Sequence, residues 1–298
     1  MAEAQDKPKE PPVIRVVDVV RSFGKAQVLC GVDMEVYPGE TMVIMGGSGC
    51  GKSTLLRHMI GSLMPDSGYV ELFGRNVCEM DEESLDAVRT RFGVLFQSGA
   101  LLNSLTVGQN VALPMKEHTD LDESTIDIMV RIKLELVNMR HAIDRIPAEI
   151  SGGMKKRAGL ARAIALDPEI LFYDEPSAGL DPVTSSQIDQ LMTDLSKKLG
   201  VSTVVVTHEM DSAFRIADRM CMLDRGVILK VGLRSEFEEI RDGPPTGDEK
   251  TDLIRQFLRG DGDGPITRRQ IGSEFEADIL QAGEVSDSGT KGLFGRKN

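Results

Sequence analysis

The chain has 298 residues, of which 41% are hydrophobic and 28% are charged. This length suits one large α/β domain or two small ones, and the composition is that of a globular protein with a sizeable core. Asp and Glu (47) outnumber Lys and Arg (35), which gives a net charge of −12. Proteins that bind nucleic acid use a basic surplus to displace counterions, so we expect no nucleic-acid partner.

Two further features bear on where the protein works. No apolar run approaches the roughly 20 residues that a membrane-spanning helix needs, and the charged start MAEAQDKPKEPP is unlike a secretory signal. The four cysteines, at positions 30, 50, 78 and 221, lack the C-x-x-C spacing of a zinc site. We therefore expect a cytoplasmic protein with reduced thiols.

The first part of the chain is predicted to be rich in strands. Residues 1–12 are polar and end in two prolines, so we expect a disordered lead-in. Strand patterns follow, with a turn at Pro38-Gly39 between the second and the third. The predicted strands cover residues 13–20, 27–37, 41–45 and 69–73.

A glycine-rich loop lies between the third of these strands and a helix predicted over residues 53–64. Its sequence fits G-x-x-x-x-G-K-[ST], the loop that wraps the phosphates of ATP or GTP. Glycines let several backbone N–H groups point at one anion, and the helix adds its positive end. We predict that Lys52 reaches the outer phosphates and that the Ser53 hydroxyl binds Mg²⁺. The predicted nucleotide-binding residues are Gly46, Gly47, Ser48, Gly49, Cys50, Gly51, Lys52, Ser53 and Thr54, with the Cys50 thiol turned away from the phosphates.

The middle of the chain has a helical pattern over residues 98–167, followed by continuous apolar strands over 170–173 and 203–206. Such strands belong inside a parallel sheet. After residue 232 the composition shifts to Gly, Asp and Pro, with one amphipathic piece at 252–258. We predict a main domain over 13–232 and a partly disordered extension over 233–298.

The strand over 170–173 ends in two adjacent carboxylates, Asp174 and Glu175. Consecutive side chains at a strand end diverge, so one carboxylate can hold the Mg²⁺ shell while the next meets water. We predict that Asp174 assists the metal and that Glu175 orients and polarises the attacking water. An apolar strand before Asp-Glu is common, and it gains meaning beside Lys52 and Ser53.

A second phosphate-binding surface is predicted at Ser151-Gly152-Gly153-Met154, where Ser151 can cap a helix and the glycines bare its first N–H groups. One nucleotide does not need two such surfaces from one subunit. We therefore predict that two chains pair head to tail, with the Lys52 loop of each facing the Ser151 segment of the other. The basic run Lys155-Lys156-Arg157 that follows either steers phosphate or forms a solvated face.

In this order and spacing, the phosphate loop, the LSGGQ-like segment and the Asp-Glu strand resemble the ATP-binding cassette (ABC) ATPases. The resemblance implies a P-loop α/β fold with a RecA-like core, an antiparallel β subdomain, a helical subdomain at about 98–167 and a C-terminal extension. It implies that Gln97 is the Q-loop glutamine on Mg²⁺ and water, that Asp181 belongs to the D-loop at the dimer interface, and that His208 is the switch histidine.

The resemblance also places Phe23 where the family stacks an aromatic ring on adenine, with Val28 beside it in the same pocket. Stacking contributes roughly 1–3 kcal/mol and discriminates little between bases, so we expect GTP to be tolerated. The alternative is that Phe23 is an ordinary core residue.

Shorter traits are similar to the ATPases of the Mla/Mce systems, which move lipids between bacterial envelope membranes. They are Met154 in place of the usual glutamine, LFQSGAL at 95–101, NVALP at 110–114, and QFL and DGP in the tail. This similarity implies a membrane-embedded permease, a lipid-binding Mce-domain protein and a small cytoplasmic accessory subunit as partners, on the cytoplasmic face of the inner membrane. The acidic, Gly-rich tail past Arg269 departs from that pattern.

Three alternatives remain open. A cassette ATPase for another solute shares every core motif and differs only in its partner. A cassette protein of DNA repair or of the ribosome is disfavoured by the acidic balance and the single cassette. A catalytically dead regulatory domain is disfavoured because Lys52, Ser53, Asp174, Glu175 and His208 are all intact.

Overall fold

The computed structural model describes residues 10–267. By its internal contacts the chain divides into two compact units, Met1–Ser235 and Glu236–Asn298. The predictions made for residues 1–9 and for the tail after residue 267 lie outside the described residues. Within 10–267, no helix combines the length and the apolar character needed to cross a bilayer.

The first unit begins with an antiparallel sheet whose strand order is β2-β1-β4-β5. Ile14 pairs with Val36 on one side and Leu72 on the other, and all three side chains are fully buried. This sheet corresponds to the β subdomain that the resemblance implied. Its strands are β1 (Ile14–Phe23), β2 (Ala26–Val36), β4 (Ser67–Leu72) and β5 (Arg75–Asn76).

A second sheet of the same unit has the order β10-β9-β3-β8-β7-β6. Its strands run parallel except β10, which pairs antiparallel with β9. Residues of β3, β7 and β8 are almost all buried, as expected for strands covered on both faces. The strands are β3 (Thr41–Met45), β6 (Phe92–Leu95), β7 (Ile170–Asp174), β8 (Ser202–Val206), β9 (Arg219–Asp224) and β10 (Val227–Leu233).

One helix joins the two sheets into a single core. Helix α1 (Lys52–Met59) contacts β2 and β4 of the first sheet and β7 and β8 of the second. Its side chains Leu55, Leu56 and Met59 belong to a buried cluster that includes residues of both sheets. The loop before α1 is therefore anchored at the centre of this unit.

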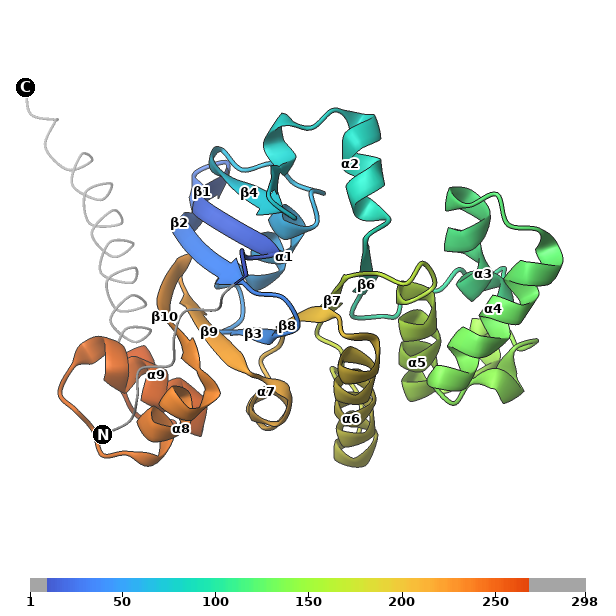
Figure 1. The fold of residues 1–298 in the computed structure, drawn as a ribbon. Helices are drawn as coiled ribbons and strands as arrows, with labels where there is room; N and C mark the ends of the chain where they lie inside the picture. The colour runs from blue at the N-terminus through green and yellow to red at the C-terminus, as the bar shows by residue number, and fades with distance from the viewer. Residues whose placement is uncertain (1–9, 268–298) are drawn as a thin grey trace, which may run out of the picture. The chain divides into compact units, whose positions relative to one another are not determined.

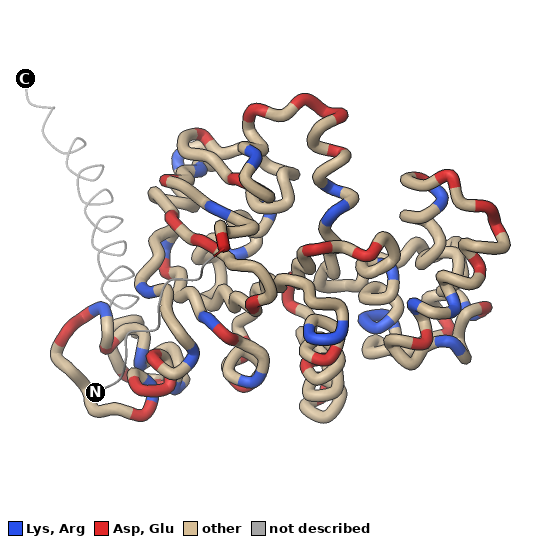
Figure 2. Tube along the Cα trace, in the orientation of Figure 1, with Lys and Arg blue, Asp and Glu red and all other residues tan. Residues whose placement is uncertain are grey.

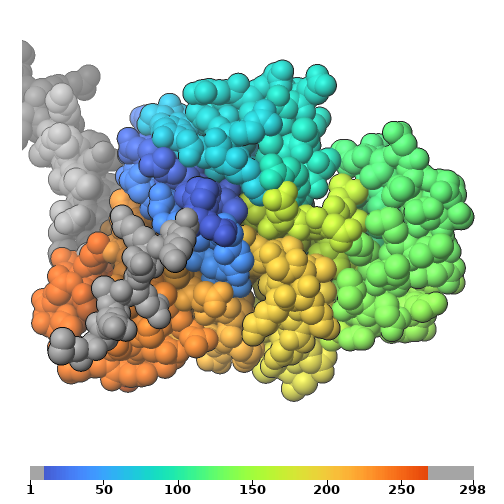
Figure 3. All heavy atoms as spheres, in the orientation of Figure 1, coloured from blue at the N-terminus to red at the C-terminus, as the bar shows by residue number. Residues whose placement is uncertain are grey.

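Among the remaining helices of this unit, α3, α4 and α5 form one group (Figure 1). Helices α3, α4 and α5 contact one another, and α5 also contacts β6 and α6. The space-filling view shows the α3–α4 region in green beside the yellow α5–α6 region (Figure 3). The helices are α2 (Glu82–Arg89), α3 (Val107–His118), α4 (Glu123–Leu136), α5 (Gly152–Ala163), α6 (Pro182–Leu199) and α7 (Met210–Ile216), with 3₁₀ turns at Val77–Glu79, Arg140–Ala142 and Pro147–Glu149.

Two helix predictions were wrong in extent. The helix predicted over 53–64 ends at Met59, because Gly61 has φ +62°, a left-handed conformation that stops a helix. In the extension there are two helices, α8 (Arg234–Asp242) and α9 (Glu249–Arg259), where one amphipathic piece was predicted. Gln256 closes the end of α9, since its amide donates to the Asp261 carbonyl and accepts from the Ile266 N–H.

Charge is mixed along the described chain. Figure 2 shows Lys and Arg positions interspersed with Asp and Glu positions on the sheets and helices. Many of these charges pair with one another, for example Arg91 with Glu169 and Arg131 with Asp127. Charges of both signs are therefore spread over the elements of the described chain.

The approach of β6 to α5 provides a test of the packing. A Cβ added at Gly93 would lie 2.0 Å from the Ala163 carbonyl oxygen. We predict that Gly93→Ala destabilises this unit by about 1–3 kcal/mol, the usual cost of overpacking. Urea or thermal unfolding measures the change. Gly262→Ala is the control, because its Cβ would meet nothing within 4 Å; equal midpoints for the two variants would contradict the packing described.

Candidate functional site

The site is built at the carboxyl ends of three neighbouring parallel strands. Ile44 of β3 and Asp174 of β7 both pair with Val206 of β8. The segments that leave these strands therefore start side by side, as at the ligand-binding edge of other α/β sheets. They carry the glycine-rich loop after β3, Asp174 and Glu175 at the end of β7, and His208 after β8.

The glycine-rich loop has a backbone that only glycine tolerates at key points. Gly49 and Gly51 have φ +74° and +110°. A Cβ at Gly51 would lie 2.9 Å from the Val28 carbonyl oxygen, and one at Gly46 would lie 2.1 Å from that of Leu223. The pattern of glycines is thus required by close backbone contacts as well as by φ.

Helix α1 begins directly after this loop and leaves its first N–H groups available. Its N-cap is Gly51, which has no side chain to accept from them, and its first turn holds no acidic residue. Orphan N–H groups and the helix dipole make such an end a binding site for an anion. The sequence places a phosphate-binding pattern at this point, and the structure gives it the matching geometry.

Lys52 lies at the first position of α1 with only 8% of its surface exposed. Its ammonium donates to the carbonyl oxygens of Gly46 and Gly47, at 2.7 Å and 2.9 Å. These contacts hold the charge at the loop, and Lys52 lines the cavity beside it. The ammonium is therefore placed to bind phosphate oxygens.

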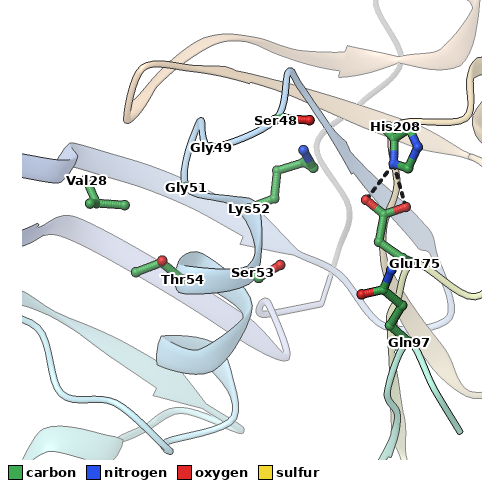
Figure 4. Close-up of a pocket in the computed structure, with 10 residues that line it drawn as sticks. All are labelled: Val28, Ser48, Gly49, Gly51, Lys52, Ser53, Thr54, Gln97, Glu175 and His208. Carbon is green, nitrogen blue, oxygen red and sulfur yellow. Dashed lines mark hydrogen bonds and ion pairs between the residues drawn. The ribbon is translucent and has the colours of Figure 1, made fainter. Parts of the chain in front are cut away.

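A cavity of about 340 Å³ opens beside the loop. Figure 4 shows the side chains of Lys52 and Ser53 on one side of it and those of Gln97, Glu175 and His208 on the other. The structure thus brings together residues that are far apart in sequence. The lining residues are Val28, Ser48, Gly49, Gly51, Lys52, Ser53, Thr54, Gln97, Glu175 and His208.

Two oxygen-bearing side chains meet at the base of the site. The Ser53 hydroxyl donates to the Asp174 carboxylate at 3.3 Å. Burial raises the pKa of Asp174, against the lowering effect of the Ser53 hydrogen bond. Hydroxyl and carboxylate oxygens suit Mg²⁺, which commonly takes one or two protein ligands and completes its shell with phosphates and water. Among the described residues no group of three His, Cys, Asp or Glu side chains is arranged to hold a metal ion.

Glu175 and His208 form a pair at the opposite side of the cavity. The His208 Nδ1 atom lies 2.9 Å from Oε1 and 2.8 Å from Oε2 of Glu175 (Figure 4). The Glu175 side chain is 12% exposed and that of His208 is 57% exposed. A carboxylate that is sheltered yet borders the cavity is placed to act as a base on a water there.

Several predicted binding residues do not line this cavity. Ser151 caps α5, as predicted, by accepting from the Met154 N–H at 3.3 Å, and Ser151 and Gly152 are exposed. The Asp181 carboxylate accepts from the Val183 and Thr184 N–H groups and caps α6. The structure places the predicted second phosphate surface, Ser151 to Met154, at an exposed helix end, and its role stays a prediction.

Phe23 and the basic run of α5 differ from some of the alternatives considered. Phe23 is 48% exposed, with the Arg21 guanidinium 5.0 Å from its ring centroid, so it is not a core residue. Lys156 is buried, and its ammonium donates to the Glu175 carbonyl oxygen. For this residue the structure therefore shows neither of the two alternatives, a phosphate-steering charge or a solvated face. Periodicity in sequence had given no signal for this contact.

Comparison with known proteins agrees with this geometry. Residues 29–178 match the family model described as ABC transporter. The chain is 39% identical to a probable ribonucleotide transport ATP-binding protein, mkl, of Mycobacterium leprae, over 92% of this chain and 77% of that protein. It is 38% identical to the intermembrane phospholipid transport system ATP-binding protein MlaF of Escherichia coli, over 88% of this chain and 94% of that protein.

The chain belongs to the ABC transporter family. The implied fold and ATPase activity, and the similarity to Mla-type ATPases, are confirmed by these relatives. Among solved structures, the ABC cassette MJ0796, in a dimeric post-hydrolysis state with ADP and Pi, is 28% identical with a TM-score of 0.68, over 74% of this chain and 98% of that one. The cbiO1 protein of Clostridium perfringens is 28% identical with a TM-score of 0.70, over 76% of this chain and 90% of that one. This ABC ATPase therefore binds and hydrolyses ATP.

The cysteine in the phosphate loop provides a test of the loop's geometry. Cys50 is 6% exposed and belongs to the core cluster, and burial raises the pKa of its thiol. Thiolates are the reactive form, so we predict that Cys50 in the folded protein resists alkylation at pH 8 while the exposed Cys78 reacts. Peptide mass spectrometry after a brief treatment with iodoacetamide measures both. Labelling of Cys50 as fast as Cys78 would show that the thiol faces solvent.

Proposed function

We propose that this ATPase powers a transporter that moves phospholipids between bacterial envelope membranes. The observation that supports it most directly is the similarity to MlaF proteins over nearly their whole length: 94% of the Escherichia coli protein and 98% of the Haemophilus influenzae one. The short traits around Gln97 and Met154 point to the same subfamily. The site geometry supports the hydrolytic step.

In this proposal each side chain that lines or adjoins the cavity has one task. The loop N–H groups and Lys52 bind the phosphates, and Ser53, Asp174 and Gln97 hold Mg²⁺, which neutralises charge on the phosphates when bound. Glu175 accepts a proton from the attacking water. His208, in contact with both Glu175 oxygens, fixes the direction of that carboxylate and faces the outermost phosphate.

We further propose that two copies pair head to tail around ATP. The N-terminus of α5 is exposed, and Ser151 caps it through the Met154 N–H. None of residues 151–154 lines the cavity of the same subunit, so this helix end is open to a partner. The related cassette MJ0796 is described as a dimer with ADP and Pi. ATP bound between the Lys52 loop of one copy and Ser151 of the other favours the closed pair, and hydrolysis with phosphate release removes that preference.

The pair is proposed to act on a membrane-embedded permease at the cytoplasmic face of the inner membrane. Helices α3, α4 and α5 follow Gln97 in the chain and are the region expected to contact it. A lipid-binding Mce-domain protein and a small cytoplasmic subunit complete the proposed assembly. Both ATP and GTP are expected to bind, because Phe23 offers a flat exposed ring for stacking on adenine or guanine and no base-specific donor.

The name of one relative supports a different solute. The Mycobacterium leprae protein, mkl, is described as a probable ribonucleotide transport protein and has similar identity to this chain. The ATPase site is the same for either cargo, so the ATPase chain alone does not separate them. The permease and its bound molecules do.

We predict that Glu175→Gln keeps ATP binding and slows turnover by about 10²- to 10⁴-fold, the usual contribution of a general base. The amide keeps the shape and loses the ability to take a proton. Phosphate release and binding of a fluorescent ATP analogue measure the two effects. Glu83→Gln on the exposed face of α2 is the matched control. Hydrolysis at the control's rate by the Glu175 variant would refute the assignment.

The cargo is tested on the whole complex. We predict that the ATPase, purified together with its permease, carries phospholipid detectable by mass spectrometry. We also predict that its ATPase rate rises in phospholipid nanodiscs loaded with the lipid-binding subunit. A complex that holds ribonucleotide other than at the ATP site, and whose rate responds to ribonucleotide and not to lipid, would favour the alternative.

A further inference from the structure

The helix that presents Ser151 also carries a buried cation. Lys156 lies on α5 and is 5% exposed. Its ammonium donates to the main-chain carbonyl oxygen of Glu175 at 3.0 Å. A single turn of helix therefore separates the exposed segment predicted to meet the partner's nucleotide from a direct contact with the catalytic loop of its own subunit.

This lysine is costly to bury. Desolvation lowers its pKa, while the charges of Glu175, Asp174 and Glu209 act in the opposite direction. A buried ammonium persists only where it is hydrogen-bonded and near opposite charge. The nearby carboxylates and the Glu175 carbonyl supply both, so the position of this charge is linked to the catalytic residues.

The backbone of Glu175 has an unusual conformation that needs support. Its φ is +49°, a left-handed value that is unfavourable for a residue with a side chain. The Glu175 N–H donates to the Val206 carbonyl at 2.9 Å, and its own carbonyl also accepts from the Ala178 N–H at 3.3 Å. Of these three hydrogen bonds, the one from Lys156 comes from a side chain, and Lys156 belongs to helix α5.

A second cation of α5 makes a similar contact. Arg162 donates to the carbonyl oxygens of Gly99 and Ala100, two and three residues after Gln97. Helix α5 thus binds the main-chain carbonyl of Glu175 and two carbonyls shortly after Gln97 in the chain. Lys156 differs from Arg162 in that it contacts Glu175, the proposed catalytic residue, directly.

We propose that Lys156 is a positioning residue: it holds the main chain of Glu175 so that the carboxylate points into the cavity, and it links that position to helix α5. The inference rests on the proposed roles of Glu175 and Ser151. When the start of α5 engages the partner's nucleotide, any movement of the helix reaches Glu175 through this contact. Each subunit's catalytic carboxylate thereby responds to the nucleotide held at the other site.

The test replaces Lys156 by Met, which keeps the length of the side chain and removes the donor. We predict that Lys156→Met leaves the KM for ATP within about twofold and lowers kcat by about 10- to 100-fold, as expected for a misplaced catalytic group. The control is Lys133→Met, because Lys133 is also 5% exposed but pairs with Asp167, and neither of these residues lines the cavity. Thermal unfolding of both variants measures the general cost of losing a buried lysine.

A double variant separates positioning from a general structural effect. If Lys156 acts through the Glu175 carboxylate, Lys156→Met added to Glu175→Gln lowers kcat little further, because the group being positioned is already inactive. An independent structural effect lowers kcat by the same factor in both backgrounds and would overturn the proposal. So would a Lys156→Met enzyme as fast as the Lys133→Met control.

The failure of this inference is distinguishable from that of the proposed function. Normal hydrolysis by Glu175→Gln alone removes the role of Glu175 and, with it, the inference. A slow Glu175→Gln enzyme beside a normal Lys156→Met enzyme removes the inference alone. If the Met variant does not fold, Lys156→Leu, which also lacks a donor and is smaller, takes its place. A Lys156→Leu enzyme as fast as the Lys133→Met control would likewise overturn the proposal.

Discussion

A triphosphate can be held tightly only where several N–H donors and a cation converge, and this requirement shapes the centre of the molecule. The donors come from a loop in which Gly46 and Gly51 approach other backbone atoms too closely for any side chain. The cation, Lys52, is the first residue of a helix packed between two sheets. Because the loop and helix are fixed by the core, the phosphate site is preorganised before any nucleotide arrives.

The other groups proposed to act in hydrolysis follow from the sheet that carries this loop. Strands β3, β7 and β8 are adjacent and parallel, so their carboxyl ends bring Asp174, Glu175 and His208 to one edge. Helix α5 then connects this edge to an exposed helix end, through the Lys156 contact with Glu175. One short helix is thereby proposed to serve two nucleotides, one in its own subunit and one in the partner.

Much of this arrangement could be predicted from sequence because it is encoded in contiguous patterns. The strand at Thr41–Met45, the loop after it and the apolar strands before Asp174 and Thr207 are all local signals. Strand β6 was not predicted, since it has four residues and includes Gly93, whose small size serves packing against α5. Strands β9 and β10 and helix α8 were also missed.

The burial of Lys156 could not be predicted for a different reason. A run of three basic residues usually faces solvent, and only the tertiary approach of Glu175 turns one of them inward. Likewise, the end of α1 depends on the conformation of Gly61. Predictions from pattern therefore succeed for the strands that precede the glycine-rich loop, Asp174 and Thr207, and fail where a contact between distant segments decides the outcome.

The central claim, that neither copy holds a complete reaction site, is tested most directly by mixing two inactive variants. Lys52→Ala disables the phosphate loop and Ser151→Arg blocks the start of α5. In a mixed symmetric pair, one site carries both defects and the other carries none, so random mixing restores ATP hydrolysis. The restored rate is at most roughly a quarter of the wild-type rate, and it is lower to the extent that the intact site depends on nucleotide at the disabled one. A mixture no more active than the two separate variants, with pairing verified, would contradict the shared site.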